Sequence, residues 1–228
     1  PDEMVARIAA DSKYWLWIND SLAVFEGGLK RGPSPGDTYY DEIDIAPYLR
    51  KGENCLSVLV WHFGRNGFSH ADSGVAGLLF EAKAPGFEIL SDKTWDATVY
   101  KAYGTAGEPE ANYRLPESNL SFDARKDITN WCSPSAPRLG RAMELPVIVG
   151  EPPFGKLVKR PIPMWKCTGL MDYPEVRRSG DTLVCSLPYN AQITPYLKVK
   201  APAGRTIKML TDHYKVALAK TQCLWCEY

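Results

Sequence analysis

Short apolar runs separated by turn residues dominate the first hundred residues of the chain. The runs are rich in aromatic and β-branched residues, and each is too short for a helix of ordinary length. In order they cover residues 4–10, 14–18, 22–25, 39–45, 55–61, 75–83, 87–90 and 94–100. Strand signals recur roughly every 8 to 15 residues, which predicts an antiparallel β-sandwich rather than alternating strands and helices.

Alternation and turn signals sharpen this prediction at particular places. Tyr14, Leu16 and Ile18 share one face of a predicted strand, and Trp15 and Trp17 share the other. We expect one set to lie in the core and the other to form a half-buried platform or an interface. Residues 32–36 contain two prolines between two glycines and therefore predict a loop, whereas residues 44–49 predict a single helical turn.

Proline changes the character of the chain between residues 134 and 175. Eight prolines fall in this stretch, and each fixes φ and removes a backbone donor. Strand-like runs return at 182–187, 191–199 and 206–211. The chain is therefore predicted to have three parts. These are a β-sandwich over 1–133, a proline-rich connector over 134–175, and the start of a second β-sandwich over 176–228.

Charge and hydropathy exclude several classes of function. Lysine and arginine number 27, as do aspartate and glutamate, so no global field attracts nucleic acid. The longest apolar stretches, 14–18 and 55–63, fall far short of the roughly 18 to 20 residues that span a bilayer. No membrane span is predicted, and residues 1–4 lack the basic start and apolar segment of a signal peptide.

The cysteines and acidic residues predict neither a cofactor nor a set of metal ligands. Six cysteines are too sparse for a disulfide scaffold, so we interpret most as buried thiols and leave their redox state open. Cys223 and Cys226 form a CxxC without the further ligands of a zinc site. Asp37, Asp41 and Asp44 offer oxygens to a structural calcium ion, but no dense calcium loop is present.

Four segments resemble non-catalytic modules of glycoside hydrolases. Residues 11–19 and 40–61 resemble the jelly-roll modules of multidomain members of this class. Residues 91–97 are similar to the SDxxWxA strand of bacterial α-L-rhamnosidase N-terminal domains. Residues 119–125, followed by Trp131, are similar to the GExYDAR…W segment of the same domains, although leucine and serine replace the usual glycine and glutamate.

Two later segments extend this resemblance to nearly the whole chain. Residues 153–165 and 188–212 resemble the linker and the start of the next sandwich in some of those enzymes. The resemblance implies an all-β fold: an antiparallel, galactose-binding-like jelly roll, then the connector and part of a second sandwich. It also implies a first strand before residue 1 and later strands after residue 228.

The resemblance implies a parent enzyme that removes terminal α-L-rhamnose from glycans or glycosides with inversion. In that family two glutamates act in a C-terminal (α/α)₆ barrel, and no long helix is predicted here, so no catalytic residue is assigned. The implied partners are a rhamnose-containing carbohydrate and the catalytic barrel of the same parent chain. The family also implies a periplasmic or secreted bacterial protein, although nothing in these residues exports it.

The stretch from Trp61 to Asp72 is the strongest candidate for contact with sugar. It follows the clearest strand and combines aromatic rings with imidazole, guanidinium, amide and carboxylate groups, which bind sugar faces and hydroxyl pairs. The candidate residues are Trp61, His62, Arg65, Asn66, His70 and Asp72. Contact with another domain and an ordinary connection are the alternatives for this loop.

Other readings of function also stay open. A stand-alone carbohydrate-binding module fits the aromatic loop, and the sugar-binding domain of a β-galactosidase-type enzyme fits the pattern of residues 44–61. Two acidic pairs, Glu42/Asp44 and Glu108/Glu110, have the spacing of residues that share a strand face, but solvated carboxylates are the default.

Overall fold

The computed structural model describes residues 2–106, 117, 119–135, 153–166, 168–189, 191, 193–210 and 225–227. Almost all of its regular structure is β, with two short 3₁₀ turns, Ala46–Tyr48 and Ala124–Lys126. None of the described helices is long and apolar enough to cross a bilayer. The chain divides into two compact units, residues 1–165 with 206–228 and residues 166–205, and each is treated by itself.

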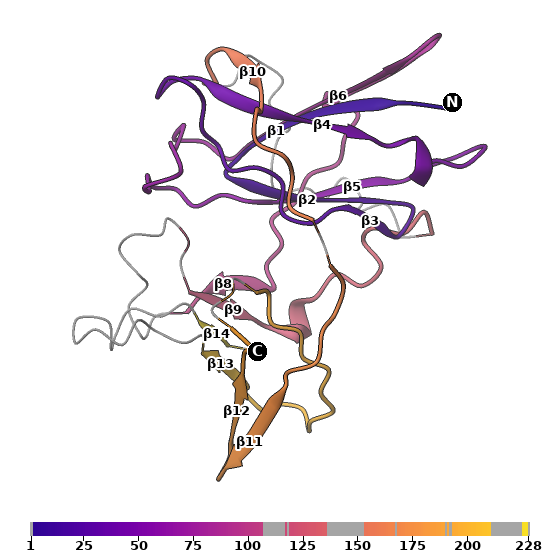
Figure 1. Ribbon diagram of the computed structural model, residues 1–228. Helices are drawn as coiled ribbons and strands as arrows, with labels where there is room; N and C mark the ends of the chain where they lie inside the picture. The colour runs from indigo at the N-terminus through magenta and orange to yellow at the C-terminus, as the bar shows by residue number, and fades with distance from the viewer. Residues whose placement is uncertain are drawn as a thin grey trace. The chain divides into compact units, whose positions relative to one another are not determined.

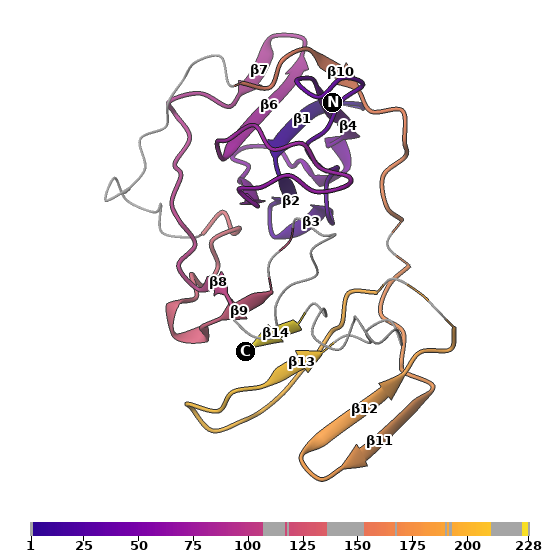
Figure 2. The ribbon, with the colours of Figure 1, turned by 90° about the vertical axis from the view of Figure 1, so that its left-hand side faces the viewer.

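A five-stranded sheet and a three-stranded sheet form the two layers of a sandwich in the first unit (Figure 1). The five-stranded sheet has the order β10 (Leu157–Lys159), β4 (Thr38–Asp44), β1 (Val5–Asp11), β6 (Gly77–Ala84) and β7 (Phe87–Leu90), which Figure 2 shows across the sheet. The three-stranded sheet has the order β3 (Ser21–Val24), β2 (Lys13–Ile18) and β5 (Leu56–Trp61). All pairings are antiparallel except that of β10 with β4.

The core lies between these two sheets. Tyr14, Leu16 and Ile18 of β2 are fully buried and belong to one apolar cluster with Ile8 of β1 and Phe80 of β6. Each such side chain contributes about 1.5–3 kcal/mol on burial. The tryptophans on the other face of β2 are half-buried, as the alternation predicts. The prediction of an all-β sandwich is confirmed.

Strand β10 comes from inside the predicted connector and joins the edge of the first sandwich. Residues 157–159 pair in parallel with residues 38–40, and the Thr38 hydroxyl donates to the Phe154 carbonyl oxygen at 2.6 Å. The next residue, Arg160, forms a buried ion pair with Asp41 of β4. The two compact units therefore meet at other positions than the domain boundaries predicted after residues 133 and 175. Those boundaries stay predictions.

A small mixed sheet completes the first unit, and a hairpin forms the second. The small sheet has the order β13 (Lys208–Leu210), β14 (Trp225–Glu227), β9 (Leu120–Phe122) and β8 (Tyr103–Thr105). The hairpin pairs β11 (Glu175–Ser179) with β12 (Thr182–Ser186).

Two predicted strands are wrong. At 94–100 the Asp92 side chain accepts hydrogen bonds from the Thr94 amide and hydroxyl, and this local turn takes the place of strand pairing. Residues 193–199 form no strand either, and their side chains are exposed.

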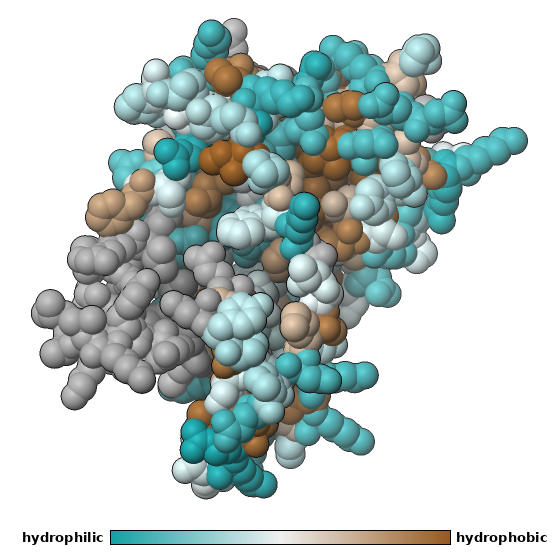
Figure 3. Space-filling model, in the orientation of Figure 1, coloured by the Kyte–Doolittle hydropathy of each residue, from teal (hydrophilic) through white to brown (hydrophobic). Residues whose placement is uncertain are grey.

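Among the coloured atoms of Figure 3, hydrophilic side chains predominate, with hydrophobic patches between them. On the five-stranded sheet, Arg7 of β1 lies between Glu42 of β4 and Glu81 of β6, at 3.3 and 3.2 Å. Lys159 of β10 pairs with Glu42 as well. A row of alternating charge therefore crosses four neighbouring strands on their solvent side.

Candidate functional site

The loop from His62 to Ala76 begins and ends beside the corner between β1 and β2. Trp61, the last residue of β5, lies opposite Lys13 in the three-stranded sheet. Gly77, the first residue of β6, lies opposite Asp11 in the five-stranded sheet. Because both ends of the loop flank residues 11–13, the sandwich itself brings the loop side chains to the end of β1.

Hydrogen bonds fix the loop to this corner. The Ser12 hydroxyl donates to Asp11 Oδ1 at 2.7 Å and accepts from the Phe63 amide at 2.9 Å. The Ser73 amide donates to Asp11 Oδ2 at 2.7 Å. Within the loop, the Asp72 amide donates to Asn66 Oδ1 at 2.8 Å. Asp11 is therefore a buried acceptor around which both arms of the loop are arranged.

Two histidines and one aspartate of the loop meet Asp11 at the end of β1. Ligand atoms of Asp11, His70 and Asp72 all lie within 4.8 Å of one another. His70 Nε2 lies 3.6 Å from Asp11 Oδ1, and the side chains of both residues are fully buried. His62 lies beside them, with Nδ1 3.4 Å from Asp11 Oδ1 and Nε2 4.0 Å from Asp72 Oδ1.

Several of these polar atoms are buried without a hydrogen-bond partner. They are Nδ1 of His62, both ring nitrogens of His70, and Oδ1 of Asp72. An unsatisfied buried polar group costs about 1–3 kcal/mol. A group of such atoms close together is therefore either compensated by a ligand or a costly feature of the fold.

The two buried members of the cluster have shifted protonation equilibria. Burial alone raises the pKa of Asp11, but hydrogen bonds from Ser73 and Ser12 outweigh it and lower that pKa below the usual range. Burial lowers the pKa of His70, against the opposing effect of the Asp11 and Asp72 carboxylates. At neutral pH the site thus holds an ionised carboxylate next to a neutral imidazole with a free lone pair.

Aromatic rings line the loop on both sides. The Phe63 ring packs edge-on against Trp61 and against His70, with centroid distances of 5.1 and 5.2 Å. Lys13 Nζ lies 5.9 Å from the Trp61 ring centroid. Phe68, in contrast, is 81% exposed at the outer side of the loop.

The six predicted sugar-contact residues divide into two groups. His62, His70 and Asp72 gather at Asp11, and His70 is buried, which argues against direct contact with a sugar. Arg65 and Asn66 are exposed and Trp61 is half-buried, and Arg65 donates to the Glu117 carbonyl oxygen at 3.1 Å. Contact with sugar stays a prediction for the whole set.

Sequence reasoning missed Asp11 and Phe68. Asp11 is 51 residues or more from the loop in the chain, and only the sheet pairing brings the two together. Phe68 belongs to the aromatic loop, but the spacing of the neighbouring residues does not predict that its ring is exposed. The glycine on its N-terminal side was the available sign of a projecting turn.

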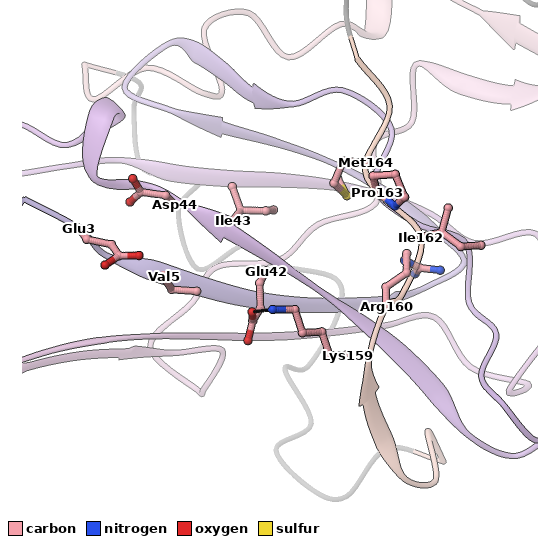
Figure 4. Close-up of a pocket in the computed structure, with 10 residues that line it drawn as sticks. All are labelled: Glu3, Val5, Glu42, Ile43, Asp44, Lys159, Arg160, Ile162, Pro163 and Met164. Atoms are coloured by element: carbon pink, nitrogen blue, oxygen red, sulfur yellow. Dashed lines mark ion pairs between the residues drawn. The ribbon is translucent and has the colours of Figure 1, made fainter.

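The acidic pair Glu42/Asp44 serves the fold. Glu42 forms an ion pair with Lys159, marked in Figure 4, and with Arg7, and these partners lower its pKa. A general acid of an inverting glycosidase needs a raised pKa. Asp44 accepts from the Met4 and Ala46 amides. The pKa of Glu42, which lines the pocket in Figure 4, is thus shifted in the direction opposite to that of a general acid.

The remaining candidates are engaged elsewhere or lie outside the described residues. Asp37 accepts from the Lys156 amide at 3.2 Å, and Asp41 pairs with Arg160, so these two proposed calcium ligands already have protein partners, as has Asp44. Glu108, Glu110 and Cys223 lie outside the described residues, as does the side chain of Cys226. Among the described cysteines, Cys55, Cys132 and Cys185 are free thiols, but none of the three is buried, so the prediction of buried thiols is wrong for them.

Comparison with known proteins finds similarity to solved structures. No protein-family profile and no curated protein sequence matches the chain. A GH78 family rhamnosidase of Bacillus sp. GL1 is similar with a TM-score of 0.58 and 26% identity, over 72% of this chain and 17% of that one. An alpha-L-rhamnosidase from Dictyoglumus thermophilum is similar in fold, with a TM-score of 0.52 and 19% identity, over 77% of this chain and 19% of that one.

These similarities confirm the resemblance to α-L-rhamnosidases. The chain spans less than a fifth of the length of each of these two proteins. The similarity therefore concerns a β-sandwich region related to these enzymes.

Proposed function

We propose that this chain is a non-catalytic β-sandwich region of an α-L-rhamnosidase-like glycoside hydrolase. The observation that carries the proposal is the similarity of 72% of the chain to one part of a solved rhamnosidase. The similar structures are rhamnosidases, which favours this reading over a β-galactosidase-type parent. Rhamnose-containing glycans, the catalytic barrel of the parent chain and an exported bacterial location belong to the same proposal.

The hydrogen bonds and ion pairs of the acidic residues favour a non-catalytic, supporting role for this region. In the described part of the chain, the acidic pair singled out from the sequence is held in ion pairs and backbone hydrogen bonds instead of being poised as acid and base. The region would support the catalytic barrel, and the outer side of the His62–Ala76 loop would contact sugar. Phe68 offers an exposed ring there, and Arg65 and Asn66 offer polar groups beside it.

Two measurements on the 228-residue chain test this function. We expect no turnover of an aryl α-L-rhamnoside, and rhamnoside hydrolysis by the purified chain would refute the non-catalytic role. Calorimetry with rhamnose-terminated and galactose-terminated glycans tests the loop. Phe68→Ala and Trp61→Ala should weaken binding of the rhamnose-terminated glycan, whereas Phe87→Ala, an exposed aromatic on β7, should leave it unchanged.

The outcomes of the calorimetry separate the candidate roles. Sub-millimolar binding that depends on the loop, in a chain without turnover, supports sugar contact and also fits a stand-alone carbohydrate-binding module. Absence of binding refutes sugar contact and leaves the supporting role. A preference for galactose-terminated glycans would overturn the rhamnosidase-type assignment.

A further inference from the structure

We infer that Asp11, His70 and Asp72 form a binding site for a divalent transition-metal ion of the Zn²⁺ type, which fastens the His62–Ala76 loop to the end of β1. The inference goes beyond the proposed function, because neither the supporting role nor sugar contact requires a metal. It rests on the geometry, burial and hydrogen bonding of these side chains.

The distances fit metal ligands better than a hydrogen-bonded network. A hydrogen bond between an imidazole nitrogen and a carboxylate has a length of about 2.7–3.2 Å. His70 Nε2 and Asp11 Oδ1 are 3.6 Å apart, which is too long. Two ligands of a tetrahedral zinc ion, each about 2.0–2.2 Å from the metal, lie roughly 3.2–3.6 Å apart. Asp72 completes a group whose ligand atoms all lie within 4.8 Å of one another.

The unpartnered atoms point independently to a ligand. His70 has a fully buried side chain, and neither of its ring nitrogens makes a hydrogen bond of ordinary geometry, although the Lys30 backbone acts on the imidazole as an acceptor. The buried Oδ1 of Asp72 lacks a partner too. A cation at the meeting point would satisfy one nitrogen of His70 and this oxygen together, and would compensate the charge of the buried carboxylates.

The surroundings of Asp11 match those of a positioned metal ligand. Its Oδ1 accepts from the Ser12 hydroxyl and its Oδ2 from the Ser73 amide, so the carboxylate is held in one orientation. Both donors leave a lone pair of Oδ1 available toward His70. His62 lies beside the group, with Nδ1 3.4 Å from Asp11 Oδ1.

The mixture of donors selects the class of ion. Calcium takes six to eight oxygen ligands, and magnesium holds several waters with one or two carboxylates. An imidazole nitrogen with two carboxylates suits zinc and its neighbours in the first transition row. A bound ion would link residue 11 to residues 70 and 72, and would thereby close a loop that is otherwise held by hydrogen bonds.

Titration of the chelator-treated chain with Zn²⁺ tests the site. A background with Cys223→Ser and Cys226→Ser removes the CxxC as a competing soft ligand set. We expect one Zn²⁺ per chain and a higher Tm with Zn²⁺ than with Ca²⁺ or chelator. Asp72→Asn and His70→Phe should each weaken Zn²⁺ binding at least about tenfold. Asp96→Asn, an exposed aspartate outside the cluster, is the matched control and should bind as the parent does.

Co²⁺ spectra and the Tm of the His70→Phe variant distinguish metal binding from a purely structural role of these residues. Co²⁺ should give the visible bands of a nitrogen and oxygen site without the near-ultraviolet band of thiolate ligation. In chelator, His70→Phe should be as stable as the parent or more so, since it removes two buried nitrogens that lack a hydrogen bond of ordinary geometry, yet it should lose the rise in Tm with Zn²⁺. Absence of Zn²⁺ binding, binding that survives both cluster variants, or a preference for Ca²⁺ would overturn the inference.

Discussion

The ion pair between Arg160 and Asp41 provides the most direct test of how the segment after residue 153 is held to the sandwich. Their side chains are 10% and 2% exposed, and Arg160 Nε lies 2.5 Å from Asp41 Oδ1. Arg160→Met keeps an unbranched apolar stem of similar reach but removes the charge. Asp41 is then left as a buried carboxylate without its cation.

The structure sets the expected magnitude. Breaking a buried ion pair by removal of one partner costs about 3–5 kcal/mol. Asp41 Oδ2 still accepts from the Tyr14 hydroxyl and the Gly28 amide, both at 2.9 Å, so the lower end of this range applies. For a chain of this size 1 kcal/mol shifts Tm by about 2–4 °C. We therefore expect Arg160→Met to lower Tm by about 6–12 °C.

Lys159→Met is the matched control. Lys159 is the neighbouring residue and pairs with Glu42 of β4, the strand that also holds Asp41, but the Lys159 side chain is 64% exposed. Solvent screens such a pair, so its loss should change Tm little. Calorimetry and urea unfolding of both variants measure the difference. Equal effects of the two substitutions would refute the reasoning, as would failure of Asp41→Asn to recover part of the loss in the Arg160→Met background.

Two further predictions concern packing and pH. Gly27→Ala should destabilise the sandwich by about 1–3 kcal/mol, because the new Cβ would lie 2.0 Å from Cε1 of the buried Tyr14 ring; Gly36→Ala, which meets nothing within 4 Å, is the control in urea unfolding. Partial burial and the hydrogen bond to Asp127 raise the pKa of Tyr100 to about 12. The neutral phenol is thus favoured in the folded state, so its contribution to stability is full below pH 10 and is lost as pH rises from 10 to 12. Tyr100→Phe should flatten the fall in the urea midpoint over that range, and an unchanged slope would contradict the assignment.

Local patterns predicted the sandwich because its strands carry their signal in adjacent residues. The alternation along β2 shows this directly, since residues 14, 16 and 18 are buried and residues 13, 15 and 17 are not. Burial of one face of a strand requires no knowledge of its partner. The helical turn after Asp44 is equally local, because that carboxylate accepts from the Ala46 amide two residues later.

Other features depend on pairings that no local pattern encodes. Strand β10 has three residues and pairs with residues 38–40, about 119 positions earlier in the chain. Its sequence, Leu157–Lys159, is too short to show a period, and the surrounding prolines predict a connector. The prediction of a strand at 94–100 was wrong because of a local hydrogen bond rather than a distant pairing. The apolar residues of this segment suit a strand, but the Asp92 side chain satisfies the Thr94 amide locally.

The candidate site combines a feature that local sequence predicts with one that depends on distant pairing. The loop after Trp61 was identified from its composition, yet its chemistry depends on Asp11, which enters through the register of two different sheets. The inner side of the loop gathers His70, Asp72 and Asp11, whereas the outer side exposes Phe68. Phe68→Ala should therefore affect glycan binding alone. If Asp72→Asn weakens both Zn²⁺ and glycan binding, the ion orders the surface that the sugar contacts. If it weakens Zn²⁺ binding alone, the hydrogen bonds from Ser73 and Ser12 suffice to hold the loop, and the two sites are independent.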